Sequence, residues 1–136
     1  MAFVIMPNHL HTILHFKKED FNLNKVIGNA KRFMAYEILD RLKEQNNSFL
    51  LEILSDAVSE REKKKGQLHK VFEESFDAKP IFSEKFLIQK INYIHYNPVS
   101  GKWNLAKSFT EYDHSSASFY ETEKVKRFKP LHYLDL

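Results

Sequence analysis

The sequence contains no cysteine, which excludes a disulfide framework and any metal site built on thiolates. It has no apolar run close to the ~20 residues that a helix needs to span a bilayer. Its start also lacks the basic flank and cleavage pattern of a signal peptide. These absences predict a cytoplasmic protein without a membrane partner. The length of 136 residues predicts one domain with a single core.

The first informative pattern is a pair of histidines near the start, in the run Pro7-Asn8-His9-Leu10-His11. Apolar residues on both sides predict one strand over residues 2–16. Side chains alternate along a strand, so His9 and His11 point to one face and Leu10 to the other. Two imidazoles on one face can bind a metal ion. A polar strand face without a metal is the alternative, and this pattern does not decide between them.

A second pattern is the predicted helix over residues 83–97. Ser83 is a suitable N-cap and Pro98 ends the helix, because the residue before a proline avoids helical geometry. Tyr93 and Asn97 are four residues apart and therefore lie on one helix face. A buried stripe has the three-and-four spacing of an amphipathic helix, with a lysine as its one exception. The stripe consists of Phe86, Leu87, Lys90, Ile91 and Ile94.

Together, the two patterns resemble a known family. Met6-Pro7-Asn8-His9-Leu10-His11 followed by Tyr93-Ile94-His95-Tyr96-Asn97-Pro98-Val99 resembles the HUH single-tyrosine transposases, in particular the REP-associated tyrosine transposase branch. Lys79-Pro80-Ile81 and Tyr112-Asp113-His114-Ser115-Ser116-Ala117 are also similar to that branch. The resemblance extends to about Tyr120 and depends on two separate motifs in the right order.

The resemblance implies a fold, a chemistry and a set of site residues. The fold is α+β, with a ferredoxin-like (RRM-like) antiparallel sheet and helices on one face. His9, His11 and Asn97 would bind a divalent metal ion, Mg²⁺ or Mn²⁺. Tyr93 would be the catalytic nucleophile, cutting and rejoining single-stranded DNA at hairpin ends through a 5′-phosphotyrosine intermediate during DNA transposition. A homodimer is a further implication, since related enzymes pair through their sheets.

Basic residues are clustered in the sequence, and the formal net charge is +3. This favours contact with phosphate backbones, although isolated basic runs are most often solvated surface. Tyr96 and His95 are alternative functional residues on the tyrosine helix, and packing is the simpler role for His95. His15 fits a surface or DNA contact better than a third metal ligand. The candidate DNA contacts are Lys31, Arg32, His15, His95, Lys64 and Lys65.

Elsewhere, apolar periodicity predicts helices over 24–45 and 48–60, capped by Asn24 and Ser48. Residues 60–66 are expected to form a loop or the frayed end of the second helix, and residues 69–81 one or two short strands. The polar tail over 99–136 is expected to run along the surface. There are no internal repeats.

One departure from the family concerns the elements ahead of the histidine strand. Family members have a strand and a helix there, whereas this chain begins almost on the histidine strand, so the expected fold is N-terminally truncated relative to the family. The chain is then a trimmed gene product, a degenerate element, or a protein that completes its sheet by dimerising. Two functions stay open: a strand-transfer enzyme, or a catalytically inactive DNA- or RNA-binding remnant. A metal-dependent nuclease that uses water is a third, weaker alternative.

Overall fold

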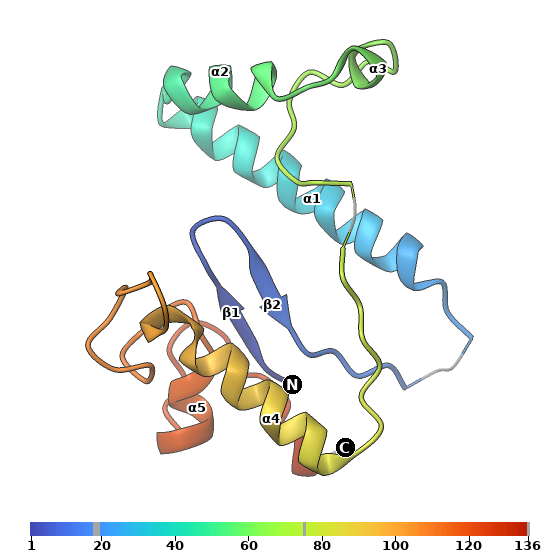
Figure 1. The fold of residues 1–136 in the computed structure, drawn as a ribbon. Coiled ribbons are helices and arrows are strands. Elements are labelled where there is room, and N and C mark those ends of the chain that lie inside the picture. Colours follow the sequence, from blue (N-terminus) through green and yellow to red (C-terminus); the bar gives the residue numbers. More distant parts are fainter. Residues whose placement is uncertain (18–19, 75, 136) are drawn as a thin grey trace. The chain divides into compact units, whose positions relative to one another are not determined.

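The computed structural model describes residues 1–17, 20–74 and 76–135. In this part the protein has a two-stranded antiparallel sheet and five α-helices. This composition agrees with the predicted α+β class. The chain divides into two compact units (Figure 1). Met1–Lys17 with Lys79–Leu136 form one, here called the hairpin unit, and Lys18–Ala78 form the other, called the helical unit.

The sheet of the hairpin unit consists of β1 (Phe3–Ile5) and β2 (Leu10–Thr12), with Val4 opposite His11. The N–H of Met6 donates to the carbonyl oxygen of His9 at 2.8 Å, which closes the turn around Pro7 and Asn8. Proline and asparagine both favour turns. The prediction of one continuous strand over 2–16 is therefore wrong, because Pro7 and Asn8 reverse the chain within it.

The edge of β1 that faces away from β2 is paired with a segment from much later in the chain. The N–H of Ile5 donates to the carbonyl oxygen of His114 at 2.8 Å, and the N–H of Ser116 donates to that of Phe3 at 3.0 Å. An antiparallel bridge joins Val4 to Ser115. Residues 114–116 thus extend the sheet beyond β1.

The segment over 99–136 also contributes to the interior, so its prediction as a surface tail is corrected. A short helix, α5 (Ala117–Thr122), follows the bridge, and its first residue Ala117 is completely buried. Two 3-10 turns, η1 (Asn97–Val99) and η2 (Tyr133–Asp135), complete the unit. The small residues Ser115, Ser116, Ala117 and Ser118, which have the composition of a polar tail, are buried beside β1.

The core of this unit lies between the hairpin and α4 (Glu84–Tyr96). Ser83 caps α4 by accepting the N–H of Phe86 at 3.3 Å, and the helix ends at Tyr96, just before the turn containing Pro98. The predicted helix over 83–97 is confirmed to within one residue at each end. The core cluster consists of Ala2, Val4, Met6, Ile13, Ile91 and Ile94.

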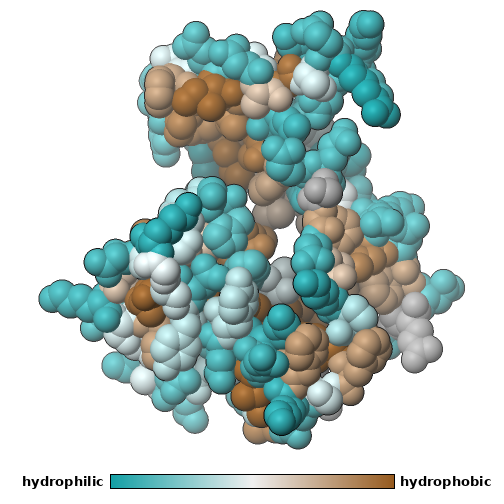
Figure 2. All heavy atoms as spheres, viewed as in Figure 1, coloured by the Kyte–Doolittle hydropathy of each residue, from teal (hydrophilic) through white to brown (hydrophobic). Residues whose placement is uncertain are grey.

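In the helical unit, α1 (Leu23–Glu44) is capped by Asn22, whose side chain accepts the N–H of Lys25 at 2.9 Å. The cap is therefore Asn22 and not Asn24. The next helix, α2 (Ser48–Asp56), is capped by Asn47 and ends four residues before the predicted boundary. Apolar side chains gather at the surface over these two helices (Figure 2).

Residues 60–66, predicted to be a loop or a frayed helix end, contain a separate short helix, α3 (Glu60–Lys63). Its start is a reciprocal capping box between Ser59 and Glu62, a strong local signal for a helix. The described residues of 69–81 contain no strand. In this segment, Lys70 forms an ion pair with Glu62 of α3 at 3.6 Å and one with Glu73 at 3.1 Å. Side-chain contacts, and not strand pairing, hold this part of the segment.

Candidate metal and tyrosine site

The two histidines lie on the face of the hairpin that packs on α4. His11 is directly opposite Val4, and residues directly opposite in an antiparallel pair share a face. Val4 is completely buried against α4, so His11 and its alternate neighbour His9 face the same side. Their ring centres are 4.8 Å apart at an interplanar angle of 78°. The prediction that both histidines share one face is confirmed, and Leu10 lies on the other face, 44% exposed.

Tyr93 meets this pair from α4. Its ring lies 5.6 Å from that of His11, at an interplanar angle of 70°. The side chain is 57% exposed, so a large substrate can reach the phenol. The structure thus brings both histidines and the tyrosine together within one copy of the chain.

Asn97 follows Tyr93 by one helical turn. Its backbone remains in the right-handed helical region, with φ −51° and ψ −44°, so the register of α4 continues through it. Residues four apart in that register are neighbours on one face. Asn97 is half-buried and lies on the tyrosine face of the helix.

Asn8 orients the first histidine, a role that the sequence analysis missed. The Nδ1 of His9 lies 2.7 Å from the side-chain oxygen of Asn8. An amide oxygen only accepts, so Nδ1 carries the proton and Nε2 of the neutral ring has a free lone pair. Histidine ligands commonly have such a partner on their second nitrogen. Its place next to His9 in the sequence is the signal that could have identified it.

Electrostatics favour the neutral form of His11. Burial lowers the pKa of its imidazole, and electrostatic repulsion from His9 and Lys90 lowers it further. Neutral imidazole is the form that binds metal ions. His11 is therefore suited to ligation around neutral pH.

Two further residues border the site. The ring of Trp103 lies 6.1 Å from that of His9, and the ammonium of Lys90 lies over the Tyr93 ring at 5.7 Å from its centre. Lys90 could have been noticed as the charged exception in an apolar stripe. No pattern in the sequence pointed to Trp103, because it reaches His9 from a loop.

The neighbours of Tyr93 on α4 have other roles. Tyr96 stacks on Phe109 with ring centres 4.2 Å apart. His95 is 2% exposed, and its Nε2 lies 2.8 Å from the Oγ of Ser116. The prediction of a DNA contact at His95 is therefore corrected: the side chain is internal and bonded to the protein, and burial lowers its pKa to about 4.

The remaining candidate DNA contacts lie outside this cluster. His15 is exposed beyond the end of β2, in the hairpin unit. Lys31 donates to the carbonyl oxygens of Glu73 and Glu74 at 2.8 Å and 3.4 Å, so it joins parts of the helical unit. Arg32, Lys64 and Lys65 are exposed in that unit. Their role in DNA binding stays a prediction.

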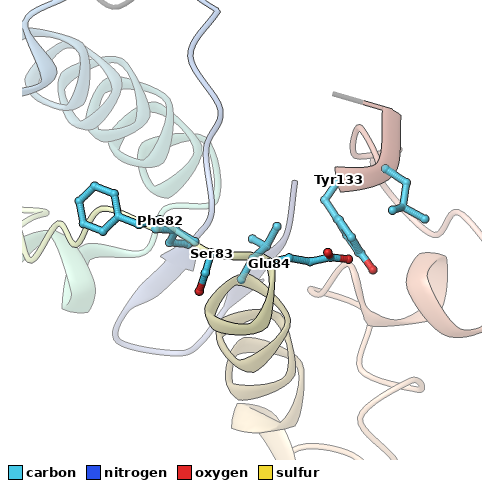
Figure 3. Close-up of a pocket in the computed structure, with 7 residues that line it drawn as sticks. Phe82, Ser83, Glu84 and Tyr133 are labelled. Atoms are coloured by element: carbon cyan, nitrogen blue, oxygen red, sulfur yellow. The ribbon is translucent and has the colours of Figure 1, made fainter.

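A surface hollow lies at the opposite end of α4, around Ser83 and Glu84. Glu84 extends toward Tyr133, while Phe82 points away from it (Figure 3). The hollow is lined by Ile81, Phe82, Ser83, Glu84, Leu87, Tyr133 and Leu134. None of these residues is among the ligands and the nucleophile predicted from the sequence. The histidines and Tyr93 therefore form a site separate from this hollow.

The donors fit a metal ion in part. The ring centres of His9 and His11 are 4.8 Å apart, a separation that allows both imidazoles to bind one ion but that is also ordinary for an aromatic contact. Within the described residues, no three His, Cys, Asp or Glu side chains converge on a possible metal position. A metal ion held by both histidines would need a third protein ligand of another type, and the resemblance assigns that position to Asn97.

Comparisons of the chain with protein-family models, curated proteins and solved structures found no match. In the described ranges, no helix combines the length and apolar character needed to cross a membrane. The residues and geometry of the hairpin unit are therefore the observations that bear on function.

Proposed function

We propose that this protein is a DNA strand-transfer enzyme of the HUH single-tyrosine transposase type. It would cleave and rejoin single-stranded DNA through a 5′-phosphotyrosine intermediate. The observation that carries the proposal is the 5.6 Å contact between the rings of His11 and Tyr93, with His9 adjacent to His11. The sequence motifs around these residues support the same family, and this support does not depend on the measured ring distances.

His9, His11 and Asn97 are the residues that would hold a divalent ion, Mg²⁺ or Mn²⁺. When bound, such an ion withdraws charge from a phosphate and makes it easier to attack. Asn8 orients His9 for this role through the 2.7 Å contact with Nδ1. Burial keeps His11 neutral and available as a ligand.

Tyr93 supplies the nucleophile. Its phenolic oxygen forms a bond to the phosphorus while the bond from phosphorus to the 3′ oxygen breaks. The phenol loses its proton to water, and the released 3′ oxygen gains one. The covalent link conserves the energy of the broken bond, so attack by a 3′-hydroxyl on the phosphotyrosine rejoins DNA and frees Tyr93.

A ferredoxin-like sheet and a homodimer belong to the same proposal. The described sheet is two-stranded, and in it the outer edge of β2 has no partner strand. Exposed strand edges favour pairing with another strand. A second copy of the chain is the partner that we propose, and the cytoplasm is the proposed place of action on DNA.

A covalent-adduct assay tests the activity. Labelled single-stranded hairpins are incubated with the protein and Mn²⁺, and the products are separated under denaturing conditions. We expect a labelled protein band in the native chain, none in Tyr93→Phe, and an unchanged band in Tyr96→Phe, whose ring stacks on Phe109.

Other outcomes identify the alternatives. If no adduct forms across a broad set of hairpins and metals, the inactive nucleic-acid-binding remnant is favoured. If Tyr93→Phe still cuts DNA and His9→Ala does not, the protein is a nuclease that uses water. Either result overturns the strand-transfer proposal.

A further inference from the structure

Lys90 is a half-buried cation on the tyrosine face of α4. It precedes Tyr93 by three residues, a spacing that makes the two side chains neighbours. Its ammonium lies over two aromatic rings, 5.1 Å from the centre of Phe86 and 5.7 Å from that of Tyr93. Lys90 is therefore held beside the proposed nucleophile.

No carboxylate of the described residues lies within ion-pair distance of this charge. Among the described residues, ion pairs within 4.0 Å are formed by lysines such as Lys63, Lys70 and Lys126, but not by Lys90. Partial burial of a charge is unfavourable unless another charge or polar group compensates it. The two rings compensate in part, since a cation over the face of an aromatic ring is attracted by it. An anion supplied from outside would complete the environment.

The neighbouring side chains indicate which anion fits. Tyr93, over whose ring Lys90 lies, is in ring contact with His11, and His11 is in ring contact with His9. A cation beside two imidazoles suits a phosphodiester, and lysine binds phosphate as a flexible point charge.

We propose that Lys90 binds a backbone phosphate of single-stranded DNA adjacent to the bond that Tyr93 attacks. The proposal rests on the proposed function for the identity of the phosphate, while the anion site itself can be tested without activity. Lys90 is a binding residue in this arrangement: it fixes the register of the strand so that the next phosphate lies at the phenol.

The first experiment uses inorganic phosphate, a chelator to remove metal, and constant ionic strength. Ring signals of His11 are followed by NMR in the full chain. We expect a saturable shift in the native chain and in Lys90→Arg, with affinity at least tenfold weaker in Lys90→Met. Lys85→Met is the matched control, since Lys85 is exposed on the same helix. No shift in the native chain, or equal binding by Lys90→Met, overturns the proposal.

The second experiment measures binding of a single-stranded oligonucleotide in a Tyr93→Phe background at several salt concentrations. Each phosphate neutralised on a single strand contributes about 0.7 to the slope of log affinity against log salt. We expect the added Lys90→Met substitution to reduce the slope by about 0.7, and the added Lys85→Met substitution to leave it unchanged. An unchanged slope in Lys90→Met contradicts the proposal.

The two proposals fail in different ways. If the native chain forms no adduct but phosphate binding depends on Lys90, the strand-transfer activity is refuted and the anion site stands. If the adduct forms at the same rate in Lys90→Met, and phosphate binding is unaffected, the activity stands and the role of Lys90 is refuted. Native-like spectra of Lys90→Arg and Lys90→Met verify that each variant is folded.

Discussion

The ring of His11 meets that of Tyr93 nearly edge-on, with 5.6 Å between their centres. The contact depends on the packing of Val4, next to His11 across the hairpin, on Ile91 and Ile94 of α4. The same packing that forms the core thus aligns the histidine face with the tyrosine face. Stability and site geometry are therefore linked in this unit.

Metal binding can be measured through the single tryptophan of the chain. The Trp103 ring lies 6.1 Å from that of His9, so paramagnetic Mn²⁺ bound at the histidines should quench its fluorescence. We expect saturable quenching in the native chain and at least tenfold weaker binding in His11→Ala. Since His11 has no ring contact with Trp103, an identical titration of this variant would contradict a shared metal site.

Asn8 should affect metal affinity through His9. Loss of a partner on the second nitrogen of a ligating histidine typically costs 10- to 100-fold in affinity. We therefore expect Asn8→Ala to weaken Mn²⁺ binding by about that factor in the tryptophan titration. Asn8→Asp is the control, because its carboxylate also accepts the Nδ1 proton. Equal loss in both variants would show that Asn8 shapes only the turn.

His95 should make the stability of the protein depend on pH. Its pKa is about 4 in the folded protein because of burial, against about 6.5 when unfolded. The unfolded chain therefore binds more protons between these values, so the stabilisation is complete above pH 6.5 and is lost as the pH falls toward 4. The expected loss is about 3 kcal/mol. Urea unfolding at several pH values measures it.

The control for this measurement is His95→Gln, which keeps a polar group near Ser116 and does not titrate. Other histidines titrate in both proteins, so the informative quantity is the difference between their pH profiles. We expect the variant to lose less stability than the native chain between pH 6.5 and 4. Parallel profiles would show that His95 is not the responsible group.

Ser116 should be important for stability because its hydroxyl connects three parts of the hairpin unit. It accepts the N–H of Phe3 at 2.9 Å and lies 2.8 Å from the Nε2 of His95. Ser116→Ala leaves these buried groups without a partner, so we expect a loss of about 1–3 kcal/mol in the free energy of unfolding. Ser100→Ala, at an exposed position, should change it by less than about 0.5 kcal/mol. Similar small effects at both positions would contradict the connecting role.

The tyrosine helix was predictable because its signals are local. Ser83 and Pro98 mark its ends, and the apolar spacing between them identifies the face that contacts the hairpin. The shared face of His9 and His11 was predicted from strand alternation and is confirmed. The turn between β1 and β2 was missed because the apolar residues around Pro7 and Asn8 gave the appearance of one longer strand.

The features that the sequence did not reveal depend on distant contacts. His95 is internal because Ser116 lies beside it, and helix periodicity contains no information about that residue. The pairing of β1 with residues 114–116 likewise joins segments with no common local pattern. The prediction of strands over 69–81 is wrong for the described part of that segment, which is held by side-chain contacts of Lys31 and Lys70.

The bridge between Val4 and Ser115 also sets an order for biosynthesis. On the ribosome, residues 3–5 emerge long before residues 114–116, and contacts so distant in the chain form only after the loop-closure entropy has been overcome. The hairpin that carries the histidines therefore leaves the ribosome first but acquires its final support among the last events of folding. Until then, a nascent chain has both histidines without the framework that fixes their positions.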